Sequence, residues 1–385
     1  MTTTLRFANG HVIAGDALWT SAAITVCDGF IAAIEPLAGS GEGGVGGGDV
    51  VDLAGGWLMP GFIDTQVNGG GGVLFNDDTS VDGIAAIGRA HAAYGTTGFL
   101  PTLISDHPER IALALAASDA AIAAGVPGVL GVHIEGPFLS PARKGIHDAG
   151  RFRLLDAEMV ALLTRPHRGV VMVTLAPELA DPALLTALAA AGVRVSAGHT
   201  EVDYDGARAA FDAGVTGVTH LFNAMPPMLG RAPGLVGAAL DDPRPWCGLI
   251  ADGVHVAPAM LRVATRARGH ERMMLVTDAM SSVGAADKDF VLQGRAIRVA
   301  NGICSHADGT LAGSDLDMAR AVANGVTMLG LAPPVAAAMA ATTPAAFLGL
   351  DRERGRLATG MRADWVRLGP DFAPRGTWIG GERAA

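Results

Sequence analysis

The sequence predicts an α/β protein: a (β/α)8 barrel of the TIM type, with a small β-sandwich domain that both ends of the chain form. First, eight short apolar runs recur along the middle of the chain, and alanine-rich segments with helical spacing separate most of them. Second, both ends show short alternating segments separated by turn residues. Third, polar side chains stand at the carboxyl ends of the apolar runs, which a closed barrel brings to one mouth. An open, doubly wound sheet is the competing fold.

The two ends are expected to form one domain. Residues 1–57 have the pattern of short strands, with a glycine-rich tract at 39–49 that predicts a mobile hairpin loop. Residues 356–385 show the same pattern, and residues 58–355 carry the barrel. The predicted barrel strands, in chain order, are 61–66, 98–103, 129–136, 170–177, 193–200, 217–222, 246–253 and 273–279.

Composition limits the class of protein. Half of the 385 residues are hydrophobic and only 17% are charged, so the chain has ample material for a core. The net charge of −10 argues against binding to nucleic acid or to an anionic membrane. The uncharged stretch from Ala321 to Leu350 is long enough to span a bilayer, but its prolines and many alanines predict two or three short helices instead. The widely spaced cysteines and the absence of a signal-peptide pattern favour a cytoplasmic location.

One carboxylate and two imidazoles are the first candidates for a functional site. Glu135, His199 and His220 lie at the ends of the third, fifth and sixth apolar runs, where a buried charge or imidazole needs a partner. One Glu and two His on neighbouring strand ends form a set that binds zinc or ferrous iron and leaves a position open for water. From the spacing alone, hydrogen bonds among the three side chains are the alternative.

A second carboxylate favours the metal site. Asp278 ends the eighth run and is expected across the mouth, where it can take a proton from water that a metal has made acidic. Its alternative role is to cap the segment that follows it. Among the histidines, His133 is expected to pack or to support the site. Six others show no evident partner and are expected at the surface or at helix ends: His11, His91, His107, His167, His270 and His306.

Several longer stretches carry a family resemblance. They follow one another along the predicted barrel, at 60–72, 131–148, 196–234, 250–258, 275–280 and 309–318, and they include HIEGPF, HLFNAMPP and ADGVHV. On these stretches the chain resembles the amidohydrolase superfamily and, within it, the N-acetylglucosamine-6-phosphate deacetylases. The resemblance implies a barrel of the amidohydrolase type. It also implies an enzyme that hydrolyses the acetamide of N-acetyl-D-glucosamine 6-phosphate to D-glucosamine 6-phosphate and acetate, in amino-sugar catabolism or recycling.

The resemblance also implies roles for individual residues. Glu135, His199 and His220 match the family's metal ligands, Asp278 matches its acid/base, and His147 matches the imidazole that polarises the acetamide carbonyl. The positions that match its substrate-binding residues are Ile146, His147, Asn223, Ala224, Arg231, His255 and the acyl-side loop of Leu311, Ala312 and Gly313. In the family, the residues that match Arg231 and His255 reach the sugar phosphate from the neighbouring subunit, so a homodimer is expected.

One departure from the wider superfamily concerns the number of metal ions. Many amidohydrolases carry His-x-His at the end of the first strand for a second metal, and here the amides Gln66 and Asn68 stand at those positions. The prediction is one tightly bound divalent ion per subunit, zinc or iron, with a weak second ion left open. The alternatives are a deacetylase for N-acetylgalactosamine 6-phosphate, a cyclic amidase or a deaminase and, more remotely, a non-catalytic assembly protein on the same fold.

Overall fold

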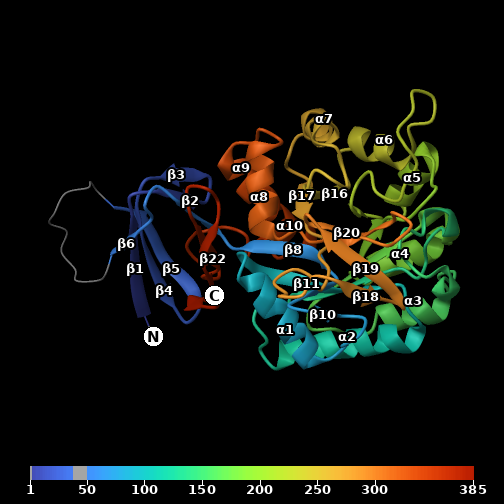
Figure 1. The fold of residues 1–385 in the computed structure, drawn as a ribbon, viewed down its shortest axis with the longest axis horizontal. Coiled ribbons are helices and arrows are strands. Elements are labelled where there is room, and N and C mark those ends of the chain that lie inside the picture. Colours follow the sequence, from blue (N-terminus) through green and yellow to red (C-terminus); the bar gives the residue numbers. More distant parts are fainter. Residues whose placement is uncertain (1, 38–49) are drawn as a thin grey trace.

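In the part of the chain that the computed structural model describes, residues 2–37 and 50–385, eight parallel strands form the centre of the molecule (Figure 1). Each strand is hydrogen-bonded to the next one along the chain: β8 (Phe62–Val67), β11 (Thr96–Ile104), β12 (Gly131–Glu135), β13 (Val170–Leu175), β14 (Arg194–Ala197), β15 (Gly217–Val218), β16 (Trp246–Ile250) and β17 (Met273–Val276). A parallel bridge from Val67 to Ala279 joins the end of β8 to the segment after β17. The predicted barrel is therefore confirmed, and each strand overlaps one of the eight apolar runs.

Helices surround the barrel (Figure 1), and their capping residues explain where many of them begin. Asp156, Asp181, Asp203 and Asp317 each accept a hydrogen bond from a backbone N–H in the first turn of the helix that follows. The helices are α1 (Val81–Ala92), α2 (Pro108–Ala123), α3 (Ala157–Leu163), α4 (Pro182–Ala190), α5 (Tyr204–Asp212), α6 (Gly234–Asp241), α7 (Pro258–Arg268), α8 (Met318–Thr327), α9 (Pro333–Ala340) and α10 (Thr342–Leu348). Short 3-10 turns lie at η1 (Pro141–Arg143), η2 (Ala149–Arg151) and η3 (Pro177–Leu179).

The uncharged stretch from Ala321 to Leu350 forms most of α8 and all of α9 and α10, as predicted. Pro333 is the first residue of α9, where the missing N–H of proline costs no helical hydrogen bond. Among the helices of the described residues, none combines the length and the apolar character that crossing a membrane requires.

Both chain ends join in a small domain beside the barrel (Figure 1). One sheet has the order β5–β4–β1–β6, with β1 (Thr2–Ala8), β4 (Ala22–Cys27), β5 (Phe30–Pro36) and β6 (Val50–Asp52). The other has the order β24–β23–β22–β7–β2–β3, with β2 (His11–Ala14), β3 (Ala17–Trp19), β7 (Trp57–Pro60), β22 (Trp365–Leu368), β23 (Pro374–Ile379) and β24 (Glu382–Arg383). Buried Phe7 and Ile24 of the first sheet pack in one cluster with Leu58 and Trp365 of the second, which confirms the predicted terminal β domain.

The limits of the domains stay a prediction. β7 belongs to the small domain and ends at Pro60, so the expected boundary after residue 57 falls inside a strand. The division into 1–57, 58–355 and 356–385 is otherwise compatible with the element order. The glycine-rich tract at 39–49, for which the sequence predicts a hairpin loop, lies outside the described residues.

An antiparallel sheet between β17 and α8 was not expected from the sequence. It consists of β18 (Phe290–Leu292), β19 (Arg295–Ala300), β20 (Ile303–Ser305) and β21 (Leu311–Ser314), and we call it the β insert. A shorter hairpin, β9 (Gly69–Gly70) with β10 (Val73–Leu74), follows β8. Leu311–Gly313, expected in a loop, therefore lie in a strand. The signal was present, because Asn301–Gly302 and Gln293–Gly294 sit at the hairpin turns with positive φ.

Asp64 ties together the two strands at which the barrel closes. The residue is buried in β8, and its Oδ1 accepts hydrogen bonds from the backbone N–H groups of Gln66 (3.2 Å) and Thr277 (3.3 Å). The Thr277 hydroxyl donates to Oδ2. Burial raises the pKa of Asp64 to about 7, although the hydrogen bonds act in the opposite direction. The carboxyl group is therefore partly protonated near neutral pH.

We expect the difference in melting temperature between Asp64→Asn and the wild type to shift in favour of the variant as the pH rises from 5 to 8. The folded-state pKa of Asp64 lies above its unfolded value of roughly 4, so the wild type loses stability as the pH rises through this window, up to about 7. The neutral amide has no such dependence. Thermal unfolding at both pH values checks this, with Asp16→Asn in an exposed turn as the control. A difference that does not change with pH would contradict a buried acid at this position.

Candidate active site

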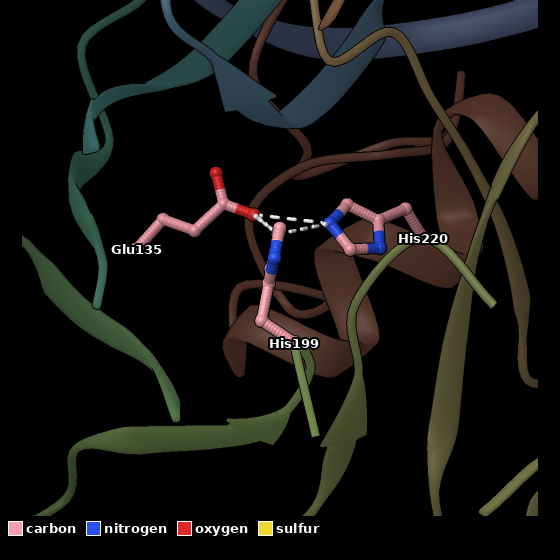
Figure 2. Close-up of side chains that lie close together, drawn as sticks. All are labelled: Glu135, His199 and His220. Atoms are coloured by element: carbon pink, nitrogen blue, oxygen red, sulfur yellow. Dashed lines mark hydrogen bonds and ion pairs between the residues drawn. The ribbon is translucent and has the colours of Figure 1, made fainter. Parts of the chain in front are cut away.

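Glu135, His199 and His220 converge at the carboxyl edge of the barrel (Figure 2). Glu135 is the last residue of β12, and the two histidines follow β14 and β15 by two residues. His220 Nε2 lies 3.1 Å from both Glu135 Oε1 and His199 Nε2, and His199 Nε2 lies 3.4 Å from Glu135 Oε1. All three residues are buried. We call these three side chains the Glu–His–His triangle.

The triangle has the dimensions of a metal site. Ligands bound at the distances usual for zinc in a tetrahedral site are separated by roughly 3.3 Å, close to the three distances observed. His199 Nδ1 lies 2.8 Å from the backbone oxygen of Arg143. Because a carbonyl can only accept, Nδ1 carries a hydrogen, and Nε2 is the ring nitrogen that faces Glu135 and His220 and can bind a metal. Electron-pair donors that face one another in this way suit a cation.

The charge of the triangle suits a divalent ion. Burial alone would raise the pKa of Glu135, but the hydrogen bonds and charges of His199 and His220 outweigh it and hold this pKa well below its usual range. Glu135 is therefore an anion at neutral pH. One carboxylate and two imidazoles leave a net positive charge on a bound divalent ion, and so keep it able to attract a further oxygen ligand.

Asp278 lies beside the triangle, two residues after β17, and the amides Gln66 and Asn68 hold it. Gln66 Nε2 donates to both Glu135 Oε1 (3.0 Å) and Asp278 Oδ1 (3.2 Å), and Asn68 Nδ2 donates to Asp278 Oδ1 at 2.6 Å. The two amides thus act as hydrogen-bond donors to the acids. Burial, followed by the negative charge of Glu135, raises the pKa of Asp278 to about 6. A carboxyl group with such a pKa can both accept and return a proton near neutral pH.

The backbone turns sharply where these side chains enter the mouth. His199, His220 and Asp278 have φ angles of 48°, 33° and 52°, in the left-handed region that residues other than glycine rarely adopt. Such conformations cost about 1–3 kcal/mol each and persist only where the surrounding structure holds them. Three of them at the ends of barrel strands indicate that the backbone here is held in the shape that points these side chains into the mouth, at a cost in local stability.

A cavity of about 390 Å³ lies over the triangle and Asp278. Most of the predicted substrate-binding residues line it: Ile146, His147, Asn223, Ala224, His255, Leu311 and Gly313. Ala312 is fully buried and packs with the core of the β insert. Residues that sequence analysis did not assign also line the cavity, among them Ile104 at the end of β11, Met280, and Thr310 in the loop before β21. Ile104 could have been assigned because it stands at the carboxyl end of a barrel strand, whereas no pattern in the sequence marks the loop residue Thr310 as part of the site.

Arg231 and His255 occupy different places. His255 lines the cavity of its own chain, and its Nδ1 lies 2.6 Å from Asp252 Oδ2. This differs from the expectation that both residues reach a neighbouring subunit, because the loop after β16 folds over the mouth of the same barrel. Arg231 does not line the cavity. It is exposed on a tight turn that backbone hydrogen bonds between Leu229 and Ala232 close in both directions.

His147 forms one side of the cavity. Its ring centroid lies 4.5 Å from that of His199, and the residue is buried. Burial, and then the nearby His199, lower the pKa of His147 to about 3, so the ring is neutral. A neutral imidazole can donate one hydrogen bond to a carbonyl oxygen, which is the role implied by the family resemblance.

Two other histidines are buried in the protein. His91, expected at the surface or at a helix end, is fully buried in α1, and its Nε2 lies 2.8 Å from Gly69 O. His91 does lie at a helix end, in the last turn of α1, but its side chain is buried because α1 packs against the β9 hairpin, which the sequence analysis did not predict. His133 lies inside the barrel with its Nε2 2.7 Å from the Thr174 hydroxyl, and burial lowers its pKa to about 4. It packs below the site, as expected.

Comparisons with known proteins agree with this geometry. The sequence profile of the amidohydrolase family matches residues 57–384. The N-acetylgalactosamine-6-phosphate deacetylase of Shewanella sp. (strain ANA-3) is 42% identical over 331 residues, which cover 86% of this chain and 84% of the relative. The crystal structure of N-acetylglucosamine-6-phosphate deacetylase from Pasteurella multocida superposes with a TM-score of 0.93 at 33% identity, over 99% of each chain. A mutant of the Mycobacterium smegmatis enzyme, in complex with N-acetyl-D-glucosamine-6-phosphate, superposes with a TM-score of 0.91 at 34% identity, over the full length of both chains. The chain belongs to the amidohydrolase family.

Proposed function

We propose that this protein is a metal-dependent deacetylase that hydrolyses N-acetyl-D-glucosamine 6-phosphate to D-glucosamine 6-phosphate and acetate. The observation that carries the proposal is the convergence of the Glu–His–His triangle and Asp278 in one cavity. Two solved structures named N-acetylglucosamine-6-phosphate deacetylase align over nearly the whole chain, and one of them contains N-acetyl-D-glucosamine-6-phosphate. The names of these relatives support the proposed substrate, and the geometry of the site supports the proposed hydrolysis.

Different residues of the cavity can carry out different steps of the hydrolysis. A zinc or iron ion held by Glu135, His199 and His220 would acidify water and attract the amide carbonyl. Asp278 accepts a proton from the attacking water and delivers it to the departing amine nitrogen, so one group serves as base and then as acid. His147 donates a hydrogen bond to the acetamide oxygen, where negative charge develops.

A further part of the proposal concerns the phosphate and the assembly. The chain carries a net charge of −10, so a phosphosugar needs local groups that attract the phosphate, and His255, which lines the cavity, is placed to be one. We propose that Arg231 supplies the second from the neighbouring subunit of a homodimer. Arg231 stands on a turn beside the exposed apolar side chains of Met228 and Leu229, which suits a contact surface. The cytoplasmic location likewise stays a prediction.

We expect Arg231→Ala to raise KM for the phosphorylated sugar about tenfold or more, and to leave activity on the unphosphorylated sugar unchanged. The guanidinium can bind phosphate through two parallel hydrogen bonds, which the alanine variant lacks. Steady-state kinetics on both sugars measure the effect. Arg375→Ala, exposed in the small domain, is the matched control. Equal losses on both sugars would mean that Arg231 has a structural role.

Mixed dimers test whether Arg231 acts on the partner. Subunits that carry Asp278→Asn are co-expressed with subunits that carry Arg231→Ala, under separate affinity tags. If Arg231 acts in trans, each mixed dimer has one complete site and recovers about half of the wild-type activity. If it acts in its own subunit, no site is complete and, at substrate concentrations well below the raised KM, the mixed dimers show no more than the mean activity of the two parents. A monomeric protein in solution would also contradict the proposal.

A second substrate deserves a direct comparison. The Shewanella relative is an N-acetylgalactosamine-6-phosphate deacetylase and shares 42% identity with this chain. Acetate release from the two epimeric phosphosugars, measured with elemental analysis of the same sample, tests the proposed function and fixes the preferred epimer. Absence of acetate release from both sugars, together with absence of stoichiometric metal, would contradict the proposal and favour a non-catalytic assembly protein.

A further inference from the structure

The buried residue Ser105 contacts His147, which lines the cavity. It follows the last residue of β11, and its hydroxyl oxygen lies 2.8 Å from His147 Nδ1. Both residues are buried. His147 Nε2 has no hydrogen-bond partner among the residues that the structure describes, and the ring lines the cavity. The imidazole is therefore bonded to the protein through one nitrogen, and its other nitrogen is available to a ligand.

The Ser105 hydroxyl has one proton and two possible acceptors. The backbone oxygen of Glu135 lies 3.5 Å away, beyond the roughly 2.5–3.0 Å that is usual for O–H···O bonds, whereas His147 Nδ1 lies within that range. The shorter contact indicates that Ser105 donates to Nδ1. When Nδ1 of a neutral imidazole accepts, the ring hydrogen resides on Nε2. The opposite arrangement would leave the buried hydroxyl proton without an acceptor at normal distance.

The β insert fixes the distance between Ser105 and His147. Gln293, in the turn between β18 and β19, donates from Nε2 to Ser105 O at 2.9 Å and accepts through Oε1 from Asp148 N at 3.2 Å. Arg295 donates to Ile146 O at 3.2 Å. The residues on both sides of His147 and the backbone of Ser105 are thus tied to the β18–β19 hairpin. These bonds hold the backbone segments that carry Ser105 and His147 next to each other.

We propose that Ser105 is a positioning residue that holds His147 in its neutral Nε2–H tautomer, with the hydrogen directed into the cavity. The identity of the acceptor, the acetamide oxygen, rests on the proposed function, but the tautomer does not. With the other tautomer, Nε2 would present a lone pair to the carbonyl oxygen and repel it. Ser105 thereby decides whether His147 can stabilise the charge that develops on this oxygen.

Nitrogen-15 NMR of the holoenzyme labelled at histidine tests the tautomer directly. The spectrum of His147→Gln identifies the signals of His147, and we expect Nε2 protonated and Nδ1 unprotonated in the wild type. Ser105→Ala should convert this pattern into a mixture of tautomers, and Ser105→Thr, which keeps the hydroxyl, should restore it. An Nδ1–H tautomer or an imidazolium in the wild type overturns the proposal, and so does an unchanged pattern in Ser105→Ala. If Ser105→Ala does not fold, the wild-type spectrum still decides.

Kinetics separate positioning from a general structural role. We expect Ser105→Ala to lower kcat about tenfold or more with little change in KM, and Ser105→Thr to recover most of the loss. A rise in KM at unchanged kcat, or an equal loss in both serine variants, contradicts the positioning role. The experiments distinguish failure of the proposed function from failure of the inference about Ser105. A protein that deacetylates neither phosphosugar can still show the Nε2–H tautomer, whereas an active enzyme with the Nδ1–H tautomer defeats only the inference about Ser105.

Discussion

Asp278→Asn is expected to lower kcat by about 10²–10⁴-fold while the metal content stays at the wild-type level. The side chain lies beside the Glu–His–His triangle and is not part of it, so the amide should not disturb metal binding. Asn68 and Gln66 both donate to Asp278 Oδ1, and an asparagine can offer its own carbonyl oxygen to them. The network then persists, and the variant loses only the ability to accept and return a proton.

Kinetics and elemental analysis of the same preparation check this prediction. Asn68→Ala is the matched control, because it removes a 2.6 Å hydrogen bond to Asp278 and keeps the acid itself. It should cost far less activity than Asp278→Asn. Retention of a tenth or more of the wild-type kcat by Asp278→Asn would rule out Asp278 as the base. Loss of metal in this variant would instead make Asp278 a ligand.

The strand ends were predictable because local sequence determines them. An apolar run that stops at a polar residue marks the carboxyl end of a parallel strand, and a barrel brings such ends together. Glu135, His199, His220 and Asp278 were all placed in this way, and the structure brings them to one mouth. A run of only a few apolar residues was enough to place each of these four side chains.

Contacts between distant loops were not predictable in this way. Gln293 reaches the backbone of Ser105 across 188 residues of sequence, and no local pattern in either segment indicates the other. The burial of His91 was missed for the same reason, since it depends on the hairpin that follows β8. Even at the site, spacing alone left two interpretations of the triangle, a metal site or three side chains that hydrogen-bond one another.

His199→Gln separates these two interpretations through stability as well as activity. We expect the variant to lose most of its bound metal and its turnover together, because a neutral amide is a poor ligand for zinc or iron. His255→Gln is the matched control, since it lines the same cavity outside the triangle and should keep the metal.

The decisive readout is the response of the melting temperature to metal. An ion that binds only the folded state stabilises it in proportion to the logarithm of its free concentration. Treatment of the wild type with a chelator should therefore lower its melting temperature, and added zinc or iron should restore it, while His199→Gln responds to neither. If the three side chains only hydrogen-bond one another, the substitution destabilises the protein equally with and without metal, and the wild type does not respond to chelation. The 3.1–3.4 Å separations of Glu135, His199 and His220 favour the first result, because they are the separations that a shared ion would impose.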